Sequence, residues 1–365
     1  MKVLVTGATG YIGGAVAKAL QVRGQEVLGL ARSERAAAKL QQTGIWPVMG
    51  DFGDRTSLVR AVLESSPDAV ISTASVGSLS GDANTFARDR DAVLALETAL
   101  GNSGKTLIFT SGSAVFGVFN RGQATQEVFA EDTPLPLPVS RFAPPGAGVP
   151  TMLATGFAGA MAARVATEQL VLNARGLRGI VVRPGLVYGH GGSFDLPALI
   201  EKIRRHGHGM HLGPGTTRQG YVHIDDLAEL YCLALERAPT GASLHGVTDE
   251  VSLGELAAAI SRMIGAHGET VSVEMPQMLG MNRLEQFGLL LTEYLPHSVL
   301  RLLQGAYSAP PNVATGISLC LNKRLSSEWT QRVLEWAPKR RDILADVEFG
   351  SYALPNADGR LPVKF

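Results

Sequence analysis

The stretch that decides the fold is Thr6-Gly7-Ala8-Thr9-Gly10-Tyr11-Ile12-Gly13, near the start of the printed sequence. It follows an apolar run and opens a segment with helical spacing. In a strand–loop–helix unit of this kind, the first glycine allows a tight turn and the second lets a pyrophosphate approach the backbone. The third lets the helix pack closely on the strand, and the free N–H groups at the helix start bind phosphate. The pattern predicts a dinucleotide site built by Thr6, Gly7, Thr9, Gly10, Tyr11, Ile12 and Gly13.

Short apolar runs alternate with longer amphipathic segments through the first half of the chain. We expect strands at 3–6, 26–31, 46–49, 69–73, 106–110 and 179–183, and helices at 12–23, 34–42, 56–65, 84–102 and 158–175. Such alternation, with uniformly apolar strands, is typical of a parallel sheet covered by helices on both faces. The predicted fold class is α/β, a doubly wound parallel sheet of the Rossmann type with a smaller C-terminal substrate-binding lobe.

The same pattern gives a prediction for the division of the chain into domains. We assign residues 1–185 to a nucleotide-binding sheet domain, to which 221–247 return. The substrate-binding lobe is expected at 186–220 and 248–345, and a tail at 346–365.

Composition restricts the partners of this 365-residue chain. Lys and Arg number 33 and Asp and Glu 33, so the formal net charge is zero and we expect no nucleic-acid partner. Cys232 and Cys320 are too few for a disulfide scaffold or a zinc site and suit a reducing cytosol. The sequence has neither a secretory apolar segment nor an uncharged apolar run of about 18 residues. We therefore expect a cytoplasmic protein without a membrane span.

The residues after the second, third and fourth predicted strands indicate which nicotinamide cofactor is used. An acidic residue at the end of the second strand would hold the ribose 2′-OH of NAD, but Arg32 and Ser33 stand there. Arg32 can pair with a 2′-phosphate and Ser33 can donate to it, although Arg32 can also be a solvated surface residue. NADP(H) is therefore favoured, with NAD(H) as the alternative. Other expected cofactor contacts are Asp51 and Phe52 beside the adenine, and Thr73, Ala74 and Ser75 along the nicotinamide half.

Several motifs appear in a familiar order and spacing. Besides the glycine loop they include Gly50-Asp51-Phe52-Gly53-Asp54, Ser111-Gly112-Ser113-Ala114-Val115-Phe116-Gly117, Val182-Arg183-Pro184-Gly185-Leu186-Val187-Tyr188-Gly189 and Tyr221-Val222-His223-Ile224-Asp225-Asp226. With these motifs the chain resembles the extended and atypical short-chain dehydrogenases/reductases, which include NAD(P)-dependent epimerases and dehydratases. The resemblance implies that the backbone at Pro184, Gly185 and Val187 also contacts the cofactor.

The superfamily's usual catalytic pair is missing. Its members use a Ser or Thr together with Tyr-x-x-x-Lys, in which the tyrosine exchanges the proton. Here no tyrosine lies between Tyr11 and Tyr188, and no lysine lies between Lys105 and Lys202. Counted back from Glu168, Arg164 falls at the lysine position and Ala160 at the tyrosine position.

Four residues remain as catalytic candidates. Ser111 and Ser113 flank the glycine at the usual serine position, and either can hold a carbonyl oxygen or merely satisfy loop backbone groups. Arg164, at the lysine position, can donate to the ribose hydroxyls, but its pKa is too high for proton exchange. Tyr188 is a proton-donor candidate near the nicotinamide end. His206, His208 and His211 lack a neighbouring Cys or carboxylate pattern, so we expect no metal site.

The expected function is reduction by NADPH of a carbonyl or conjugated ring in a small apolar or aromatic molecule, such as a secondary metabolite. The proline-rich segment Glu131–Pro150 and the apolar segment Phe287–Leu303 suggest this substrate class. Core or dimer packing, a lid and contact with a membrane surface all stay open for Phe287–Leu303. The alternatives are a nucleotide-sugar epimerase or dehydratase and a non-enzymatic NADP(H) sensor. We expect a monomer or a homodimer.

Overall fold

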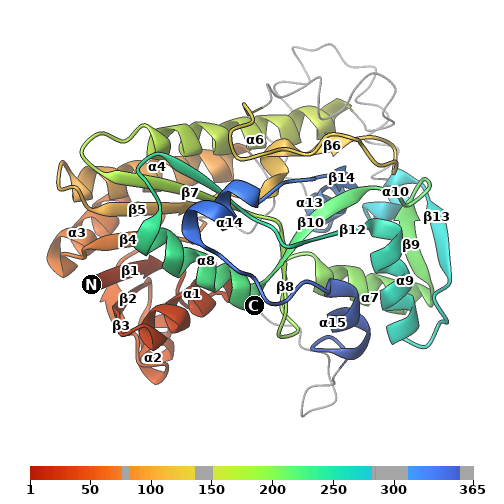
Figure 1. Ribbon diagram of the computed structural model, residues 1–365, viewed down its shortest axis with the longest axis horizontal. Helices are drawn as coiled ribbons and strands as arrows, with labels where there is room; N and C mark the ends of the chain where they lie inside the picture. Colours follow the sequence, from red (N-terminus) through yellow and green to blue (C-terminus); the bar gives the residue numbers. More distant parts are fainter. Residues whose placement is uncertain (76–82, 136–150, 282–283, 285–310, 354–365) are drawn as a thin grey trace.

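The computed structural model describes residues 1–75, 83–135, 151–281, 284 and 311–353 (Figure 1). Seven parallel strands of these residues form one sheet with the order β11-β7-β5-β4-β1-β2-β3. In that order the strands are β11 (Ala242–Gly246), β7 (Arg178–Pro184), β5 (Thr106–Thr110), β4 (Ala69–Ser72), β1 (Lys2–Thr6), β2 (Glu26–Ala31) and β3 (Trp46–Met49). The chain leaves β1 for β2 and β3 on one side and for β4 on the other. A ligand crevice forms at such a switch point, beyond the carboxyl ends of the strands.

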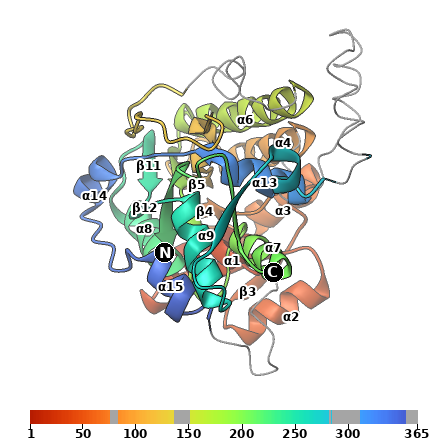
Figure 2. The same ribbon diagram turned by 90° about the vertical axis from the view of Figure 1, so that its right-hand side faces the viewer.

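Helices cover both faces of the sheet. One face carries α1 (Tyr11–Val22), α2 (Glu34–Gln42) and α8 (Ile224–Arg237), and the other carries α3 (Arg55–Ser65), α4 (Ala83–Leu100) and α6 (Thr151–Leu172). Figure 2 shows the strands between α8 on one side and α3 and α4 on the other. The doubly wound α/β fold predicted from the sequence is confirmed.

The strand sequences explain why the sheet is buried on both faces. Val3 and Val5 pack with α1 and α8, whereas Leu4 between them packs with α3 and α4. All three side chains are fully buried, and each such burial contributes about 1.5–3 kcal/mol. A strand that is apolar at every position therefore requires cover on both sides.

The second lobe is built mostly from later parts of the chain, and residues 113–119, which follow β5, pack into its core. Its three-stranded sheet has the order β12 (Asp249–Ser252), β10 (Arg218–His223), β8 (Leu186–Tyr188). Two further pairs are β9 (Gly209–Leu212) with β13 (Thr270–Val273), and β6 (Val118–Phe119) with β14 (Leu321–Asn322). The remaining helices of the described residues are η1 (Ser113–Phe116), α7 (Leu196–His206), α9 (Leu253–Met263), α10 (Met275–Met278), α13 (Pro311–Cys320), α14 (Glu328–Leu334) and α15 (Ile343–Phe349). Much of this lobe lies at one end of the sheet domain (Figure 1).

The domain limits stay a prediction, with one difference at the C-terminal side. Helix α14 lies within the range assigned to the substrate-binding lobe, yet Leu334 and the following Trp336 pack into the core formed with α8 and β11. The indole N–H of Trp336 donates to the Asp226 carbonyl over 3.0 Å. Residues 136–150 of the proline-rich segment, the segment Phe287–Leu303 and the tail after 353 lie outside the described residues.

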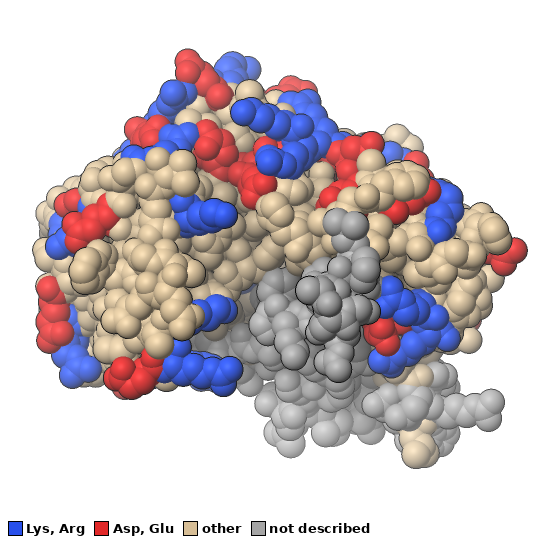
Figure 3. All heavy atoms as spheres, turned by 90° about the horizontal axis from the view of Figure 1, so that it is seen from below, with Lys and Arg blue, Asp and Glu red and all other residues tan. Residues whose placement is uncertain are grey.

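The apolar character of the helices and the charge distribution on the surface bear on the expected partners. Among the described helices, none combines the length and apolar character needed to cross a membrane. On the face drawn in Figure 3, basic and acidic side chains are interspersed.

Candidate functional site

The glycine loop has the geometry on which its prediction rests. Gly7 has a φ of 76°, a backbone conformation that residues with a Cβ rarely adopt. Its carbonyl accepts a hydrogen bond from the Gly10 N–H over 2.8 Å. A Cβ on Gly13 would lie 2.2 Å from the Gly7 oxygen and 2.5 Å from Thr73 Oγ1. Gly13 therefore lets α1 start directly against the ends of β1 and β4.

The start of α1 is open to an anion. Its N-cap Gly10 is exposed and supplies no side-chain cap, and the first turn contains no acidic residue. By contrast, Ser33 caps α2, Asp54 caps α3 and Ser252 caps α9. The first N–H groups of α1 are thus available for a pyrophosphate, and the positive end of the helix dipole favours it.

Hydrogen bonds join the strand ends that border the crevice. The Thr73 hydroxyl donates to the Thr6 carbonyl over 2.6 Å, and the Ala74 N–H donates to Thr6 Oγ1 over 3.3 Å. Ser75 is held from the other side, because its hydroxyl donates to Asp89 on α4 over 2.7 Å. These contacts order the segment predicted to follow the nicotinamide half.

On the adenosine side, the predicted residues differ in their exposure. Arg32 is exposed directly after β2, and Ser33 uses its hydroxyl oxygen to accept the Ala36 N–H over 3.3 Å. Asp51 is exposed, and its carboxylate accepts the Gly53 N–H over 2.8 Å. Phe52 is only 8% exposed and packs in the core with α3, so it offers little surface to an adenine.

Two of the loop's side chains turn toward the protein. The Tyr11 hydroxyl donates to the Gly189 carbonyl over 2.8 Å, and a Cβ on Gly192 would meet the Tyr11 ring at 2.5 Å. Ile12 packs against the core beneath α1. Tyr11 therefore joins the glycine loop to the segment that leads into the second lobe.

The backbone at the end of β7 lies against the second lobe. A Cβ on Gly185 would lie 2.3 Å from the Gly220 carbonyl of β10, so only glycine fits between the two strands. Pro184 is buried at the end of β7, and Val187 is half-buried in β8. The predicted nicotinamide contacts thus lie at the junction of the two sheets.

Ser111 belongs to a buried chain of polar groups. Its hydroxyl donates to Glu168, whose carboxylate forms an ion pair with Arg183 at 2.7 Å. Arg183 also lies 3.3 Å from His245 Nε2, and His245 Nδ1 lies 2.9 Å from the Ser326 carbonyl. Burial and the Arg183 charge lower the pKa of His245 to about 3, so the imidazole is neutral at pH 7.

Arg164 braces the same segment. Its Nη2 donates to the carbonyls of Thr110 over 3.0 Å and Ser111 over 2.9 Å, and its guanidinium carbon lies 4.8 Å from the centre of the Phe86 ring. Burial lowers the pKa of Arg164, with the Asp89 and Glu168 carboxylates acting in the opposite sense. In the structure its contacts are with the end of β5; the predicted contact with ribose stays a prediction.

The two candidate serines therefore differ. The Ser111 side chain is bonded to Glu168, its N–H donates to the Val182 carbonyl over 2.8 Å, and Arg164 holds its carbonyl. Ser113 begins the short helix η1 and is 4% exposed. Within the described part of the chain, we find no hydrogen bond to the Ser113 side chain. Ser113 is therefore the better placed of the two to receive a substrate oxygen.

The geometry does not favour Tyr188 as a proton donor. Its buried hydroxyl donates to the Arg340 carbonyl over 3.3 Å, and its ring packs edge-on against His223. Burial, together with several nearby carboxylates, raises the pKa of Tyr188 well above its ordinary value. These contacts connect β8 with the C-terminal segment.

Glu168, Arg183 and His245 were not predicted as members of the site. The available signal was the presence of Arg183 and His245 at the ends of otherwise apolar strands, where an ionisable residue requires a partner. The sequence does not show that Glu168 on α6 is that partner.

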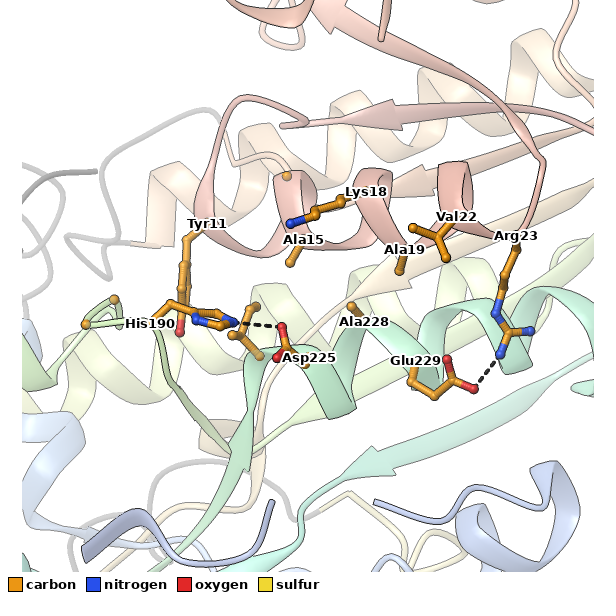
Figure 4. Close-up of a pocket in the computed structure, with 14 residues that line it drawn as sticks. Tyr11, Ala15, Lys18, Ala19, Val22, Arg23, His190, Asp225, Ala228 and Glu229 are labelled. Atoms are coloured by element: carbon orange, nitrogen blue, oxygen red, sulfur yellow. Dashed lines mark hydrogen bonds and ion pairs between the residues drawn. The ribbon is translucent and has the colours of Figure 1, made fainter. Parts of the chain in front are cut away.

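A separate hollow of about 550 Å³ lies between α1 and α8 (Figure 4). At its edge His190 Nε2 lies 2.9 Å from Asp225 Oδ1, and with His223 these residues bring three possible metal ligands within 4.8 Å of one another. The His223 Nδ1 already accepts the Asp225 N–H over 3.1 Å, and Arg340 pairs with Asp225 at 3.0 Å. Because these contacts occupy the ligand atoms, the predicted absence of a metal stays our expectation.

Together the parallel sheet, the glycine loop and the open helix start define a dinucleotide-binding enzyme of the short-chain dehydrogenase/reductase type. The model of the NAD dependent epimerase/dehydratase family matches residues 3–143 and 161–245. The chain belongs to this family and is an NAD(P)-dependent oxidoreductase. The resemblance stated from the motifs is thereby confirmed.

Several known proteins are similar to this chain. An uncharacterised protein of Schizosaccharomyces pombe is 28% identical over 96% of this chain and 100% of its own length. The 4-hydroxy-2-methyl-3-oxo-4-farnesyl-3,4-dihydroquinoline-1-oxide ketoreductase of Stigmatella aurantiaca is 31% identical over 68% of each chain. The 2-alkyl-3-oxoalkanoate reductase of Stenotrophomonas maltophilia is 28% identical over 70% of this chain and 71% of its own. Among solved structures, the UDP-glucose 4-epimerase of Thermotoga maritima superposes with a TM-score of 0.62 at 17% identity, covering 96% of this chain and 97% of the epimerase.

Proposed function

We propose that this enzyme uses NADPH to reduce the ketone carbonyl of a small apolar or aromatic molecule. The observation that carries the proposal is the difference between the two serines: Ser111 is bonded to Glu168, whereas the Ser113 hydroxyl has no protein partner among the described residues. The names of two relatives, a ketoreductase for a farnesylated quinoline oxide and a 2-alkyl-3-oxoalkanoate reductase, support a ketone with a large apolar group.

The cofactor, when bound, supplies the hydride. Glycines 7, 10 and 13 and the start of α1 would hold its pyrophosphate, because the helix start is uncapped and Gly10 is exposed. Arg32 would pair with the 2′-phosphate, since it is exposed after β2 and no carboxylate stands at the end of that strand.

In this mechanism Ser113 donates a hydrogen bond to the substrate carbonyl oxygen and stabilises the negative charge that develops there. Arg164, Glu168 and the β5 backbone hold the serine loop in place. The tyrosine that normally supplies the proton has no counterpart on α6, whose sequence contains neither Tyr nor Lys. We propose that water or an acidic hydroxyl of the substrate supplies the final proton.

The test compares the activities of Ser113→Ala and Ser111→Ala on a panel of quinones and aryl ketones. Activity is measured as the rate of NADPH oxidation. We expect Ser113→Ala to lower kcat by about 10²–10³ with little change in stability, because one oxyanion donor is lost. Ser111→Ala should lower thermal stability, because Glu168 loses a buried donor. Equal activity of the Ser113 variant and the wild type would exclude this role.

The same panel separates the alternatives. A protein that binds NADPH tightly but oxidises it with no member of the panel would be a sensor. Interconversion of nucleotide sugars without net NADPH consumption would indicate an epimerase.

A further inference from the structure

The turn that leads from β8 to α7, residues 189–192, has an unusual backbone. Gly189, His190 and Gly191 have positive φ values of 112°, 52° and 68°. His190 carries a Cβ, which makes this conformation unfavourable, so the turn persists only where its surroundings hold it. Backbone that is held in this way is concentrated at ligand sites, so the contacts of the 189–192 turn are a guide to its function.

The C-terminal segment holds the 189–192 turn through Tyr352. The Gly189 N–H donates to the Tyr352 hydroxyl over 2.8 Å, and that hydroxyl donates to the Gly192 carbonyl. Tyr352 is only 2% exposed. Its hydroxyl therefore uses its donor and an acceptor position on the two ends of the turn.

Ser351 adds a third bond between the same two segments. Its Oγ accepts the Gly191 N–H over 2.9 Å. The Ser351 N–H and hydroxyl each donate to the carboxylate of Asp346, on α15, over 2.9 Å. Helix α15 thus fixes Ser351, and the turn is bonded to residues at least 160 positions further along the chain.

The 189–192 turn is also bonded to the glycine loop. The Tyr11 hydroxyl donates to the Gly189 carbonyl over 2.8 Å, and the Tyr11 ring leaves no space for a Cβ on Gly192. Figure 4 shows the Tyr11 side chain extending from the start of α1 toward His190. Tyr11 is the first residue of α1, so its backbone N–H is one of those open to a pyrophosphate.

The two tyrosines meet at Gly189. Tyr352 accepts the N–H of this residue and Tyr11 donates to its carbonyl, so Gly189 connects the C-terminal segment with the glycine loop. Burial raises the pKa of Tyr11 and of Tyr352 well above the ordinary value, so both hydroxyls are protonated at pH 7 and can donate. A displacement of the turn would therefore displace Tyr11 and the start of α1 with it.

We propose that Tyr352 is a positioning residue for the cofactor. By fixing the 189–192 turn it sets the position of Tyr11, and with it the N–H groups that would hold the pyrophosphate. This inference rests on the proposed use of NADPH. It gives a role in cofactor binding to a segment that the sequence analysis assigned to a tail.

The experiment measures by calorimetry the affinity of Tyr352→Phe for NADPH and for adenosine 2′-phosphate. The second ligand carries the phosphate that Arg32 would bind but no pyrophosphate. We expect the variant to bind NADPH about fivefold or more weakly than the wild type, because the turn loses two bonds and Tyr11 its support. The affinity for adenosine 2′-phosphate should be unchanged, because this ligand does not reach the glycine loop.

The matched control is Tyr231→Phe, which removes a buried hydroxyl bonded to Thr110 over 2.6 Å. Both variants should melt at a lower temperature than the wild type, because each loses buried hydrogen bonds. Only Tyr352→Phe should lose affinity for NADPH. Ser351→Ala, which leaves the Gly191 N–H without its acceptor, repeats the test if Tyr352→Phe fails to fold.

A double variant tests whether Tyr352 acts through the turn. Tyr11→Phe should also weaken NADPH binding, because it removes the bond to Gly189. If both tyrosines act through the same turn, the double variant should bind NADPH about as weakly as the weaker single variant. Losses of affinity that multiply would mean that the two tyrosines act independently.

The outcomes separate the positioning role from the proposed function. Unchanged NADPH affinity in Tyr352→Phe, or in Ser351→Ala where it replaces that variant, overturns the role. Equal losses for NADPH and adenosine 2′-phosphate, or independent effects of the two tyrosines, also overturn it. All three results leave the reductase proposal intact if the wild type reduces a ketone of the panel. A selective loss of NADPH affinity in a protein that reduces no member of the panel supports the role of Tyr352 and refutes the reductase proposal.

Discussion

Replacing Glu168 with Gln tests the buried chain that holds Ser111. The Glu168 carboxylate is 0% exposed and the Arg183 side chain 3%, and the two are joined by bonds of 2.7 and 3.1 Å from Nη2 and Nε. The variant keeps the shape of the side chain but leaves the Arg183 charge buried without its counter-charge. Breaking a buried pair in this way costs about 3–5 kcal/mol, so we expect a loss of that size in the free energy of unfolding.

The measurement is urea unfolding followed by circular dichroism, with Glu229→Gln as the control. Glu229 also pairs with an arginine, Arg23, but its side chain is 45% exposed, so the loss should be under about 1 kcal/mol. The reasoning is refuted if the two variants lose equal stability. It is also refuted if Glu168→Gln retains the full stability of the wild type.

Three further predictions concern the cofactor and the pH dependence of stability. Arg32→Asp should weaken NADPH binding by about 2–3 kcal/mol and weaken NADH binding far less. The control is Arg60→Asp on α3. Equal losses of affinity for both cofactors would contradict the role of Arg32. Gly10→Val should abolish NADPH binding while the apo protein keeps its melting temperature, and retained affinity would place the pyrophosphate elsewhere. The pKa of His245 is lowered to about 3 in the folded chain, so the unfolded chain binds more protons between about pH 3 and 6.5. Stability should therefore fall by up to about 1.4 kcal/mol per pH unit as the pH is lowered through this window, and a variant His245→Gln should lack that contribution.

The fold was predictable because its signals are local. The runs at 26–31, 46–49 and 106–110 coincide with β2, β3 and β5, since apolar segments between glycines and charged residues have few alternatives to a strand. Strands β2 and β5 are buried, whereas β3 lies at the edge of the sheet and is partly exposed. The loop from Gly7 to Gly13 was predictable for the same reason, because its glycines are required by backbone contacts within the loop and with Thr73.

The side-chain partners were not predictable, because they depend on contacts between distant segments. Tyr11 bonds to Gly189, 178 positions away, and Ser111 bonds to Glu168, 57 positions away. Two serines separated by one glycine look equivalent in the sequence. Because α6 packs beside β5 and β7, Glu168 forms its hydrogen bond with Ser111 and not with Ser113.

Helix α6 also explains how the chain can lack the usual catalytic pair. In the superfamily that our motifs resemble, this helix supplies a tyrosine and a lysine to the reaction. Here its residues at the corresponding turn, Arg164 and Glu168, bond to the Thr110 and Ser111 carbonyls and to the Ser111 hydroxyl. The Arg164 guanidinium, which bonds two backbone carbonyls, holds the backbone in position and is not a proton donor in the way a tyrosine is. The Glu168 carboxylate is paired with Arg183. In our proposal the helix supports the serine loop, and Ser113 polarises the substrate oxygen.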